Sequence, residues 1–337
     1  MSFKGWALAG LLALGGWAVA DTPVRSDHPE TYRVIKGDTL WDISARFLNS
    51  PWLWPEIWQA NPDIANPHLI YPGDLVRLVY VNGVPRLVVD RNQIIKLSPT
   101  ARPQPLAGAI PTLPLSVIGP YLSGNQMVAA GELDASPYVL AQRDGKILST
   151  DNDVAYARGE AVYGLEHYGL YRKGRTFIDE ATGDVLGIEA IAVGRASVVN
   201  RDAGLTRVRL HDSVREVRAA DRLLPLPPAL SSDFVPSAPP PGMTGSILSV
   251  VDGVQQVGQY DVVIVDRGRR DGMVAGNVLS IQREGAQVLD PVSGETVQLP
   301  NERSGLMMVF RVFDRLSYAL VVQADRAMRV GDPLSSP

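Results

Sequence analysis

The C-terminal two-thirds of the 337-residue chain contains an internal repeat. Residues 171–224 and 282–335 align without a gap at a constant offset of 111 residues, with 11 identities in 54 positions. The identical pairs include Arg172 with Arg283, Asp179 with Asp290, Gly183 with Gly294, Gly194 with Gly305, and Asp221 with Asp332. Weaker matches upstream extend the repeat to residues 137–225 and 245–335. An internal duplication predicts that the two copies have related folds, and the two copies together make up most of the chain.

Both copies have the sequence pattern of β-structure. Segments such as VVIVDRG, MMVFRVF and YALVVQA are apolar or alternating over four to seven residues, and Gly and Asp turns separate them. The sequences DEATGD at 179–184 and DPVSGE at 290–295 predict hairpin turns, since each supplies a glycine for a positive φ. We therefore expect two related all-β modules of barrel or sandwich type.

Two proline-containing stretches separate the predicted modules. Residues 81–136 are expected to form a linker with short elements, and residues 226–244 form a second, proline-rich linker. Overall composition agrees with folded domains, because 45% of the residues are hydrophobic and 20% are charged. The net charge of −4 and the interleaved signs exclude the basic stripe that nucleic-acid binding needs.

The N-terminus is typical of a secretory signal. Lys4 precedes an uncharged run from residue 5 to residue 19, and Ala18-Val19-Ala20 has the small-x-small form of a signal-peptidase site. The run is too short for a comfortable membrane span, although an uncleaved anchor is the alternative. Because the chain has no cysteine, its exported domains must rely on hydrophobic cores alone. We expect residues 1–20 to be a cleaved signal peptide and the mature chain to be periplasmic.

Residues 31–80 have the pattern of a strand, two helices and a closing strand. Thr39 is placed to cap the first helix, and Asp42 stands three residues later in the capping-box position. Pro55 suits the first position of the second helix, which should stop at Asn61. The two strands are expected at residues 32–35 and 75–79.

Four tryptophans lie in this small predicted domain. Trp41 and Trp58 fall on helical apolar stripes, so we expect both to be packed in a core that has no disulfide to support it. Trp54 is placed to fold back on Trp58. Trp52 is expected to be the most exposed of the four. It is either an ordinary surface residue or a contact for a sugar or a partner protein.

The sequences YRVIKGDTLWDISARF at 32–47 and IWQANPDIANPHLIYPGDLVRL at 57–78 resemble the LysM family. LysM domains are small βααβ modules that bind N-acetylglucosamine-containing glycans such as peptidoglycan. The GDTLW opening, the NP turn and the IYPGD closing stand in the family's order. The expected fold is therefore multidomain α+β, with a βααβ LysM module followed by two related all-β modules.

The resemblance also implies a glycan-binding groove between the loop that enters the first helix and the loop that leaves the second. An uncharged sugar is best held by backbone N–H and C=O groups, with an apolar wall for the acetyl methyl group. Carried onto this sequence, the groove residues are Gly37, Asp38, Thr39, Leu40, Asn61, Pro62, Asp63, Ile64 and Ile70. The alternative is that Thr39 only caps a helix and Asn61 only stops one.

Sequence motifs of common hydrolases are absent. The four histidines, His28, His68, His167 and His211, form no H-E-x-x-H or H-x-H pair, and there is no G-x-S-x-G or S-x-x-K motif. The abundant Asp and Glu residues leave a glycosidase's carboxylate pair open. Two diverged copies of one β module favour a scaffold. We expect no catalytic residue, metal or cofactor, with a peptidoglycan hydrolase or hydrolase activator as the alternative.

A LysM domain, a proline-containing spacer and a β-rich C-terminal region together resemble the type IV pilus secretin-associated protein family. The C-terminal part of this likeness rests on DRGRRDGMVAGNVLSI at 266–281 and the terminal GDPL. The resemblance implies an accessory protein that ties an outer-membrane secretin to peptidoglycan. The expected function is thus a non-catalytic adaptor whose partners are peptidoglycan and a secretin or similar envelope ring, with homo-oligomers forming on that partner.

Overall fold

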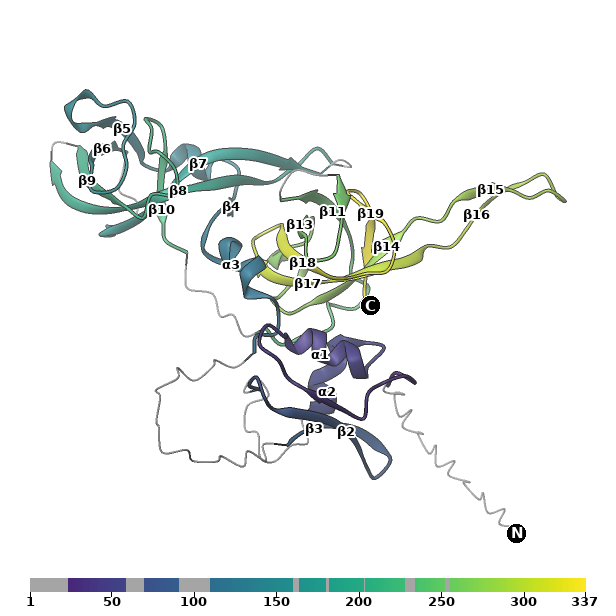
Figure 1. Ribbon diagram of the computed structural model, residues 1–337. Coiled ribbons are helices and arrows are strands. Elements are labelled where there is room, and N and C mark those ends of the chain that lie inside the picture. Colours follow the sequence, from purple (N-terminus) through teal and green to yellow (C-terminus); the bar gives the residue numbers. More distant parts are fainter. Residues whose placement is uncertain are drawn as a thin grey trace, which may run out of the picture.

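The computed structural model describes residues 24–58, 70–90, 110–159, 164–179, 182–202, 204–227, 234–251 and 255–337. The predicted signal peptide lies outside these residues. A small N-terminal domain lies below a β-barrel in Figure 1, and another β region lies to the left of the barrel. Within the described ranges, no helix has the length and apolar character that crossing a membrane requires.

The N-terminal domain combines a three-stranded antiparallel sheet with two short helices. Its elements are β1 (Thr31–Arg33), α1 (Leu40–Phe47), the 3-10 turn η1 (Pro51–Leu53), α2 (Trp54–Trp58), β2 (Leu75–Val81) and β3 (Val84–Asp90). Asn82 and Gly83 both have positive φ, 52° and 82°, as a tight hairpin requires. The hairpin adds β3 to the sheet, which therefore extends into the stretch predicted as a linker.

Helix α1 begins as its sequence predicts. The Thr39 hydroxyl accepts a hydrogen bond from the Asp42 N–H at 3.1 Å and donates to the Asp42 carboxylate at 2.7 Å. Leu40, Ile43 and Phe47 are buried along one face. The predicted N-cap is thus confirmed.

The four tryptophans divide between two cores. Trp54 and Trp58 are buried inside the N-terminal domain, where their rings pack edge to face at 6.3 Å. Trp41 is also buried, but in a different cluster that includes side chains of the barrel, and Trp52 packs partly buried against that cluster. Trp52 is thus the most exposed of the four tryptophans, as expected, although it is half-buried. Its neighbours are supplied by a distant part of the chain, which no local pattern reveals.

The first β region follows a short helical connection. Its elements are α3 (Leu115–Ser123), β4 (Gln126–Val128), α4 (Glu132–Ala135), β5 (Tyr138–Gln142), η2 (Arg143–Gly145), β6 (Val154–Arg158), β7 (His167–Ile178), β8 (Val185–Asp202), β9 (Leu205–His211) and β10 (Arg222–Pro225). The strands pair in the order β4-β8-β7-β10-β5-β6-β9. Because β9 also pairs with β8, the ladder returns on itself around a buried apolar cluster.

The second β region is a closed six-stranded barrel in the order β11-β13-β18-β17-β14-β20. The elements of this region are β11 (Thr244–Val250), β12 (Gln256–Val257), β13 (Val262–Val265), η3 (Arg269–Asp271), β14 (Val278–Arg283), β15 (Gln287–Leu289), β16 (Thr296–Gln298), β17 (Glu302–Val312), β18 (Ser317–Ala324), β19 (Met328–Arg329) and β20 (Pro333–Ser335). A LysM-like N-terminal domain followed by an all-β region agrees with the expected fold class.

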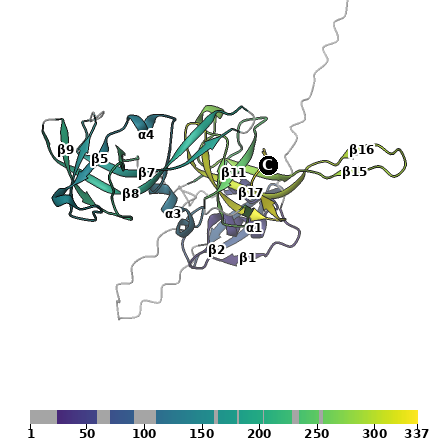
Figure 2. The same ribbon diagram turned by 90° about the horizontal axis from the view of Figure 1, so that it is seen from above.

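Two long hairpins emerge from the β regions with different surroundings. The β7–β8 hairpin lies against the barrel, with Phe177 and Leu186 in the shared cluster and the Arg315 guanidinium donating to the Val185 carbonyl at 3.2 Å. The β15–β16 hairpin instead extends away from the barrel (Figures 1 and 2), and all residues of its two strands are exposed.

One apolar cluster joins the parts of the molecule. Trp41 of the N-terminal domain, Leu113 and Ile118 of the connection, and barrel side chains such as Tyr318 all belong to it. Phe234, within the predicted 226–244 linker, is buried in the same cluster. The N-terminal domain therefore shares a core with the barrel.

Candidate functional site

The loop that enters α1 is held in shape by Asp38. Its carboxylate accepts hydrogen bonds from the Ile35 N–H at 2.9 Å and the Tyr32 hydroxyl at 3.0 Å. Burial and this carboxylate raise the pKa of Tyr32, so the phenol remains a donor. Gly37 has a φ of 102°, which a side chain would oppose. These contacts give the predicted groove residues Gly37 and Asp38 a structural role in fixing the loop.

The predicted groove residues Thr39 and Leu40 form the start of α1 and are almost fully buried. As the first helical residue, Leu40 has a backbone N–H that finds no acceptor inside the helix. It donates instead to the Pro111 carbonyl at 3.0 Å. This backbone donor is therefore available to a ligand only when Pro111 moves away.

Ile70 supplies a hydrogen-bond acceptor, whereas Leu40 supplies a donor. Its side chain is fully buried, and its carbonyl accepts a hydrogen bond from the Ile110 N–H at 2.8 Å. The following turn is fixed by Asp74, whose carboxylate accepts from the Tyr71 N–H at 3.0 Å. Since Ile110 and Pro111 are adjacent, the Leu40 donor and the Ile70 acceptor lie close to each other, on either side of the same short segment.

The remaining predicted groove residues, Asn61, Pro62, Asp63 and Ile64, lie outside the described residues. The structure thus brings together Leu40 and Ile70 from the predicted set, and places Thr39 at the helix start beside them. The two bonded groups of the neighbouring segment, the Ile110 N–H and the Pro111 C=O, belong to different peptide units. The N-acetyl groups of a glycan carry the same two kinds of group, one N–H and one C=O each.

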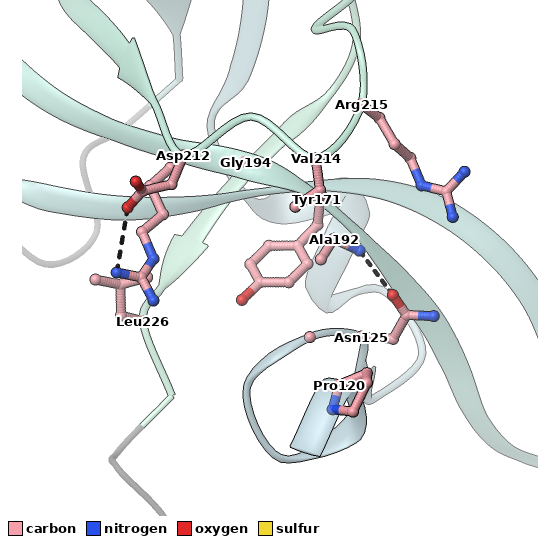
Figure 3. Close-up of a pocket in the computed structure, with 11 residues that line it drawn as sticks. Pro120, Asn125, Tyr171, Ala192, Gly194, Asp212, Val214, Arg215 and Leu226 are labelled. Carbon is pink, nitrogen blue, oxygen red and sulfur yellow. Dashed lines mark hydrogen bonds and ion pairs between the residues drawn. The ribbon is translucent and has the colours of Figure 1, made fainter. Parts of the chain in front are cut away.

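A second concave site was missed by the sequence analysis (Figure 3). This pocket of about 450 Å³ is lined by residues from α3, the first β region and the segment after β10, including Pro120, Asn125, Tyr171, Arg195, Asp212 and Arg215. Much of its polar lining is engaged internally. The Asn125 side-chain oxygen accepts from the Ala192 N–H at 3.0 Å, and Arg195 pairs with Asp212 at 3.4 Å. These residues are far apart in sequence, so no local signal could have found the pocket.

Within the described residues, no three His, Asp or Glu side chains form a group that could hold a metal ion. The Leu40 N–H and the Ile70 carbonyl offer a different, uncharged chemistry, with the fully buried Ile70 side chain beside them.

Comparison with known proteins agrees with this reading of the N-terminal domain. Residues 32–78 match the LysM domain family. A stretch of 60 residues is 37% identical to the uncharacterized protein YqbP of Bacillus subtilis (strain 168), covering 15% of this chain and 27% of that protein. The matched stretch thus spans about a quarter of the relative's length. The backbone groove lies within the family match, and residues 32–78 of this protein are a LysM domain.

Proposed function

We propose that this protein is a non-catalytic periplasmic adaptor, which binds peptidoglycan through its LysM domain and holds an envelope complex through its β region. The observation that carries the proposal is the LysM match, with the Leu40 donor and the Ile70 acceptor inside it. The envelope partner is the outer-membrane secretin of type IV pili. Support for that partner is the order of domains and the resemblance described above.

In this proposal, the groove recognises the acetamide group of N-acetylglucosamine. The Leu40 N–H donates to an acetyl carbonyl, and the Ile70 carbonyl accepts from an acetamide N–H. Asn61, Pro62, Asp63 and Ile64 are proposed to complete the site. Each such hydrogen bond contributes about 1 kcal/mol net. One domain therefore binds a glycan weakly, with a dissociation constant on the order of 1 mM.

The β region is proposed to be a scaffold made from two copies of one module. Strand order supports this, because shifting β7, β9 and β10 by 111 residues places them on β14, β18 and β20. The longer β8 falls on β16 and β17 together. The ring order β5-β6-β9-β8-β7-β10 then corresponds to β11-β13-β18-β17-β14-β20 of the barrel.

The β15–β16 hairpin is the proposed contact with the envelope partner. Val288, Leu289, Val292, Val297 and Leu299 are all at least 39% exposed on it, with Val292 at the tip 94% exposed. Five exposed apolar side chains on one projecting element are unusual for a monomer surface and are typical of an interaction site. Its counterpart β7–β8 already packs on a β-barrel within the same chain.

The groove assignment is tested by replacing Thr39 and Asn61 together with alanine. We expect the mature double variant to remain folded, losing about 1 kcal/mol of stability for the Thr39 cap. It should pellet with purified sacculi much less than the parent does. Retention equal to the parent's by a folded double variant would refute the groove.

The adaptor proposal is tested with the full chain in cells. Deleting residues 31–80 should release the protein from sacculi and spare its association with the secretin. Replacing Val288, Leu289 and Val292 with serine should leave the protein on sacculi and abolish its association with the secretin. If neither change alters what co-purifies, the proposed division of labour is wrong.

The competing function is a wall hydrolase or an activator of one. Zymography on sacculi separates the two, because a scaffold leaves the gel uncleared. A cleared band for the mature chain, or for the chain mixed with an envelope extract, would replace the adaptor with the hydrolase function.

A further inference from the structure

A short segment of the chain itself lies across the LysM groove. This segment, residues 110–113 (Ile-Pro-Thr-Leu), is called the strap. Its Ile110 N–H donates to the Ile70 carbonyl at 2.8 Å, and its Pro111 carbonyl accepts from the Leu40 N–H at 3.0 Å. The strap therefore occupies the two backbone groups through which the groove is proposed to bind a glycan.

The strap is also anchored at both ends by buried side chains. Ile110 is 5% exposed and belongs to the core of the LysM domain, among residues such as Phe47 and Ile70. Leu113 is fully buried in the cluster that contains Trp41 and the barrel residues. The two anchors hold the strap in place on either side of its hydrogen bonds.

From these contacts we infer that the strap is an internal ligand that closes the glycan groove, so that peptidoglycan binds only when the strap is displaced. The inference rests on the proposed function, since it concerns regulation of the same groove. One donor and one acceptor cannot serve the strap and an acetamide at the same time. Pro111 adds to the fit because it presents a carbonyl with no competing N–H.

Closure of this kind weakens binding by a calculable factor. The apparent dissociation constant is the intrinsic constant divided by the fraction of molecules with an open groove. A strap closed in about 90–99% of molecules therefore weakens glycan binding about 10- to 100-fold.

One feature of the strap keeps its closure incomplete. Thr112 is 2% exposed, yet its hydroxyl has no hydrogen-bond partner among the described residues. Burying an unsatisfied hydroxyl opposes closure. Replacing that hydroxyl with a methyl group should therefore tighten the strap.

The strap is linked to the barrel as well as to the LysM domain. It leads directly into α3, and the buried Arg311 of the barrel donates to the Tyr121 and Asn125 carbonyls at the end of that helix, at 2.6 and 2.7 Å. A partner that shifts α3 on the barrel would thereby pull on the strap.

The experiment compares full-length mature variants for binding to N-acetylglucosamine tetramer and to sacculi. Ile110→Pro removes the strap's N–H donor and should strengthen binding about tenfold. Thr112→Val should weaken binding about threefold to tenfold. The matched control is Leu115→Asp, an exposed position just past the strap that should leave binding unchanged.

Hydrogen exchange gives a second readout that does not depend on the glycan. The Leu40 amide should be protected in the parent, more protected in Thr112→Val and less protected in Ile110→Pro. Equal glycan binding by the parent and both variants would overturn the strap and leave the groove intact, as would rapid Leu40 exchange in the parent. Failure of every variant, Ile110→Pro included, to bind glycan would overturn the proposed function itself.

Discussion

Buried polar side chains of the two β regions differ in whether they have a partner. Asp221 is 2% exposed and accepts from the Arg172 guanidinium at two positions, both at 2.8 Å, and from the Arg218 N–H at 2.7 Å. Tyr318, in the barrel, is fully buried with a hydroxyl that has no partner among the described residues. These two residues should respond to substitution in opposite ways.

Asp221→Asn should destabilise the protein by about 3 kcal/mol, because it leaves the Arg172 charge without its buried carboxylate. The repeat supplies a matched comparison in Asp332→Asn. Asp332 is buried too, but its ion-pair partner Arg329 is 76% exposed, so the expected loss is only about 1 kcal/mol. Urea unfolding measures both, and equal losses would contradict this account.

Tyr318 should make the protein sensitive to alkali. Burial raises the pKa of Tyr318 above its ordinary value, so the folded state keeps a proton that the unfolded chain releases above pH ~10. Stability is therefore complete below that pH and falls as the pH rises further, by up to about 1.4 kcal/mol per pH unit for this one group.

Tyr318→Phe should remove that alkaline decline while leaving stability at pH 7 unchanged or slightly higher. The control is Tyr80→Phe, at a position 62% exposed, which should keep the parent's pH profile. Thermal unfolding between pH 7 and 11 provides the measurement. If the stability of Tyr318→Phe falls with rising pH as steeply as that of the parent, another group causes the loss of stability at alkaline pH.

Two corresponding hairpins are closed by the same hydrogen bond and have different surroundings. Asp179 N–H donates to the Asp184 carbonyl at 2.8 Å, and Asp290 N–H donates to the Glu295 carbonyl at the same distance. Gly183 and Gly294 have φ values of 76° and 74°. Equal local geometry therefore leads to a docked hairpin in one region and a projecting hairpin in the other.

Removal of the projecting hairpin should leave the barrel stable. Replacing residues 286–299 with a short glycine-containing turn deletes only exposed strand residues, so the melting temperature should change by no more than about 2 °C. The corresponding change in β7–β8 deletes Phe177 and Leu186 from the shared core and should be strongly destabilising. Calorimetry of the two deletions tests the contrast, which fails if they cost the same.

At the scale of the whole molecule, the LysM domain and the barrel should unfold together. Trp41 is 3% exposed in the cluster that joins them, and the Tyr260 hydroxyl lies 3.3 Å from the Asp42 carboxylate across the same boundary. Trp41→Ala should split one calorimetric transition into two. Trp58→Ala, inside the LysM core, should instead lower the temperature of the single joint transition without splitting it. A single transition in Trp41→Ala would mean that other contacts couple the two parts.

Attachment to the wall should also be a property of the assembly. Many weak LysM domains held on one ring raise the effective glycan concentration for one another, and linked sites gain ~10²–10⁴ in avidity. If the proposed secretin is the partner, the full chain assembled on it should remain on sacculi far longer than the full chain alone. Wash-off rates of the two measure this, and equal rates would refute the avidity argument.

Local features of this protein were determined by its sequence. The Thr39 cap, the turn at 290–295 and the β pattern of the C-terminal region depend on neighbouring residues, and the structure has each of them. The LysM motif was likewise readable, because its residues stand in a fixed order over a short span.

Only the tertiary structure decided what the groove and the tryptophans touch. Leu40 is bonded to Pro111, and Ile110 is bonded to Ile70, through backbone groups. Because nearly every residue has a backbone N–H and every residue a C=O, no side-chain pattern in the sequence marks these bonds. Trp41 and Trp52 likewise meet barrel side chains more than two hundred residues away. Such contacts depend on how complete domains pack, and the sequence near each residue carries no record of that packing.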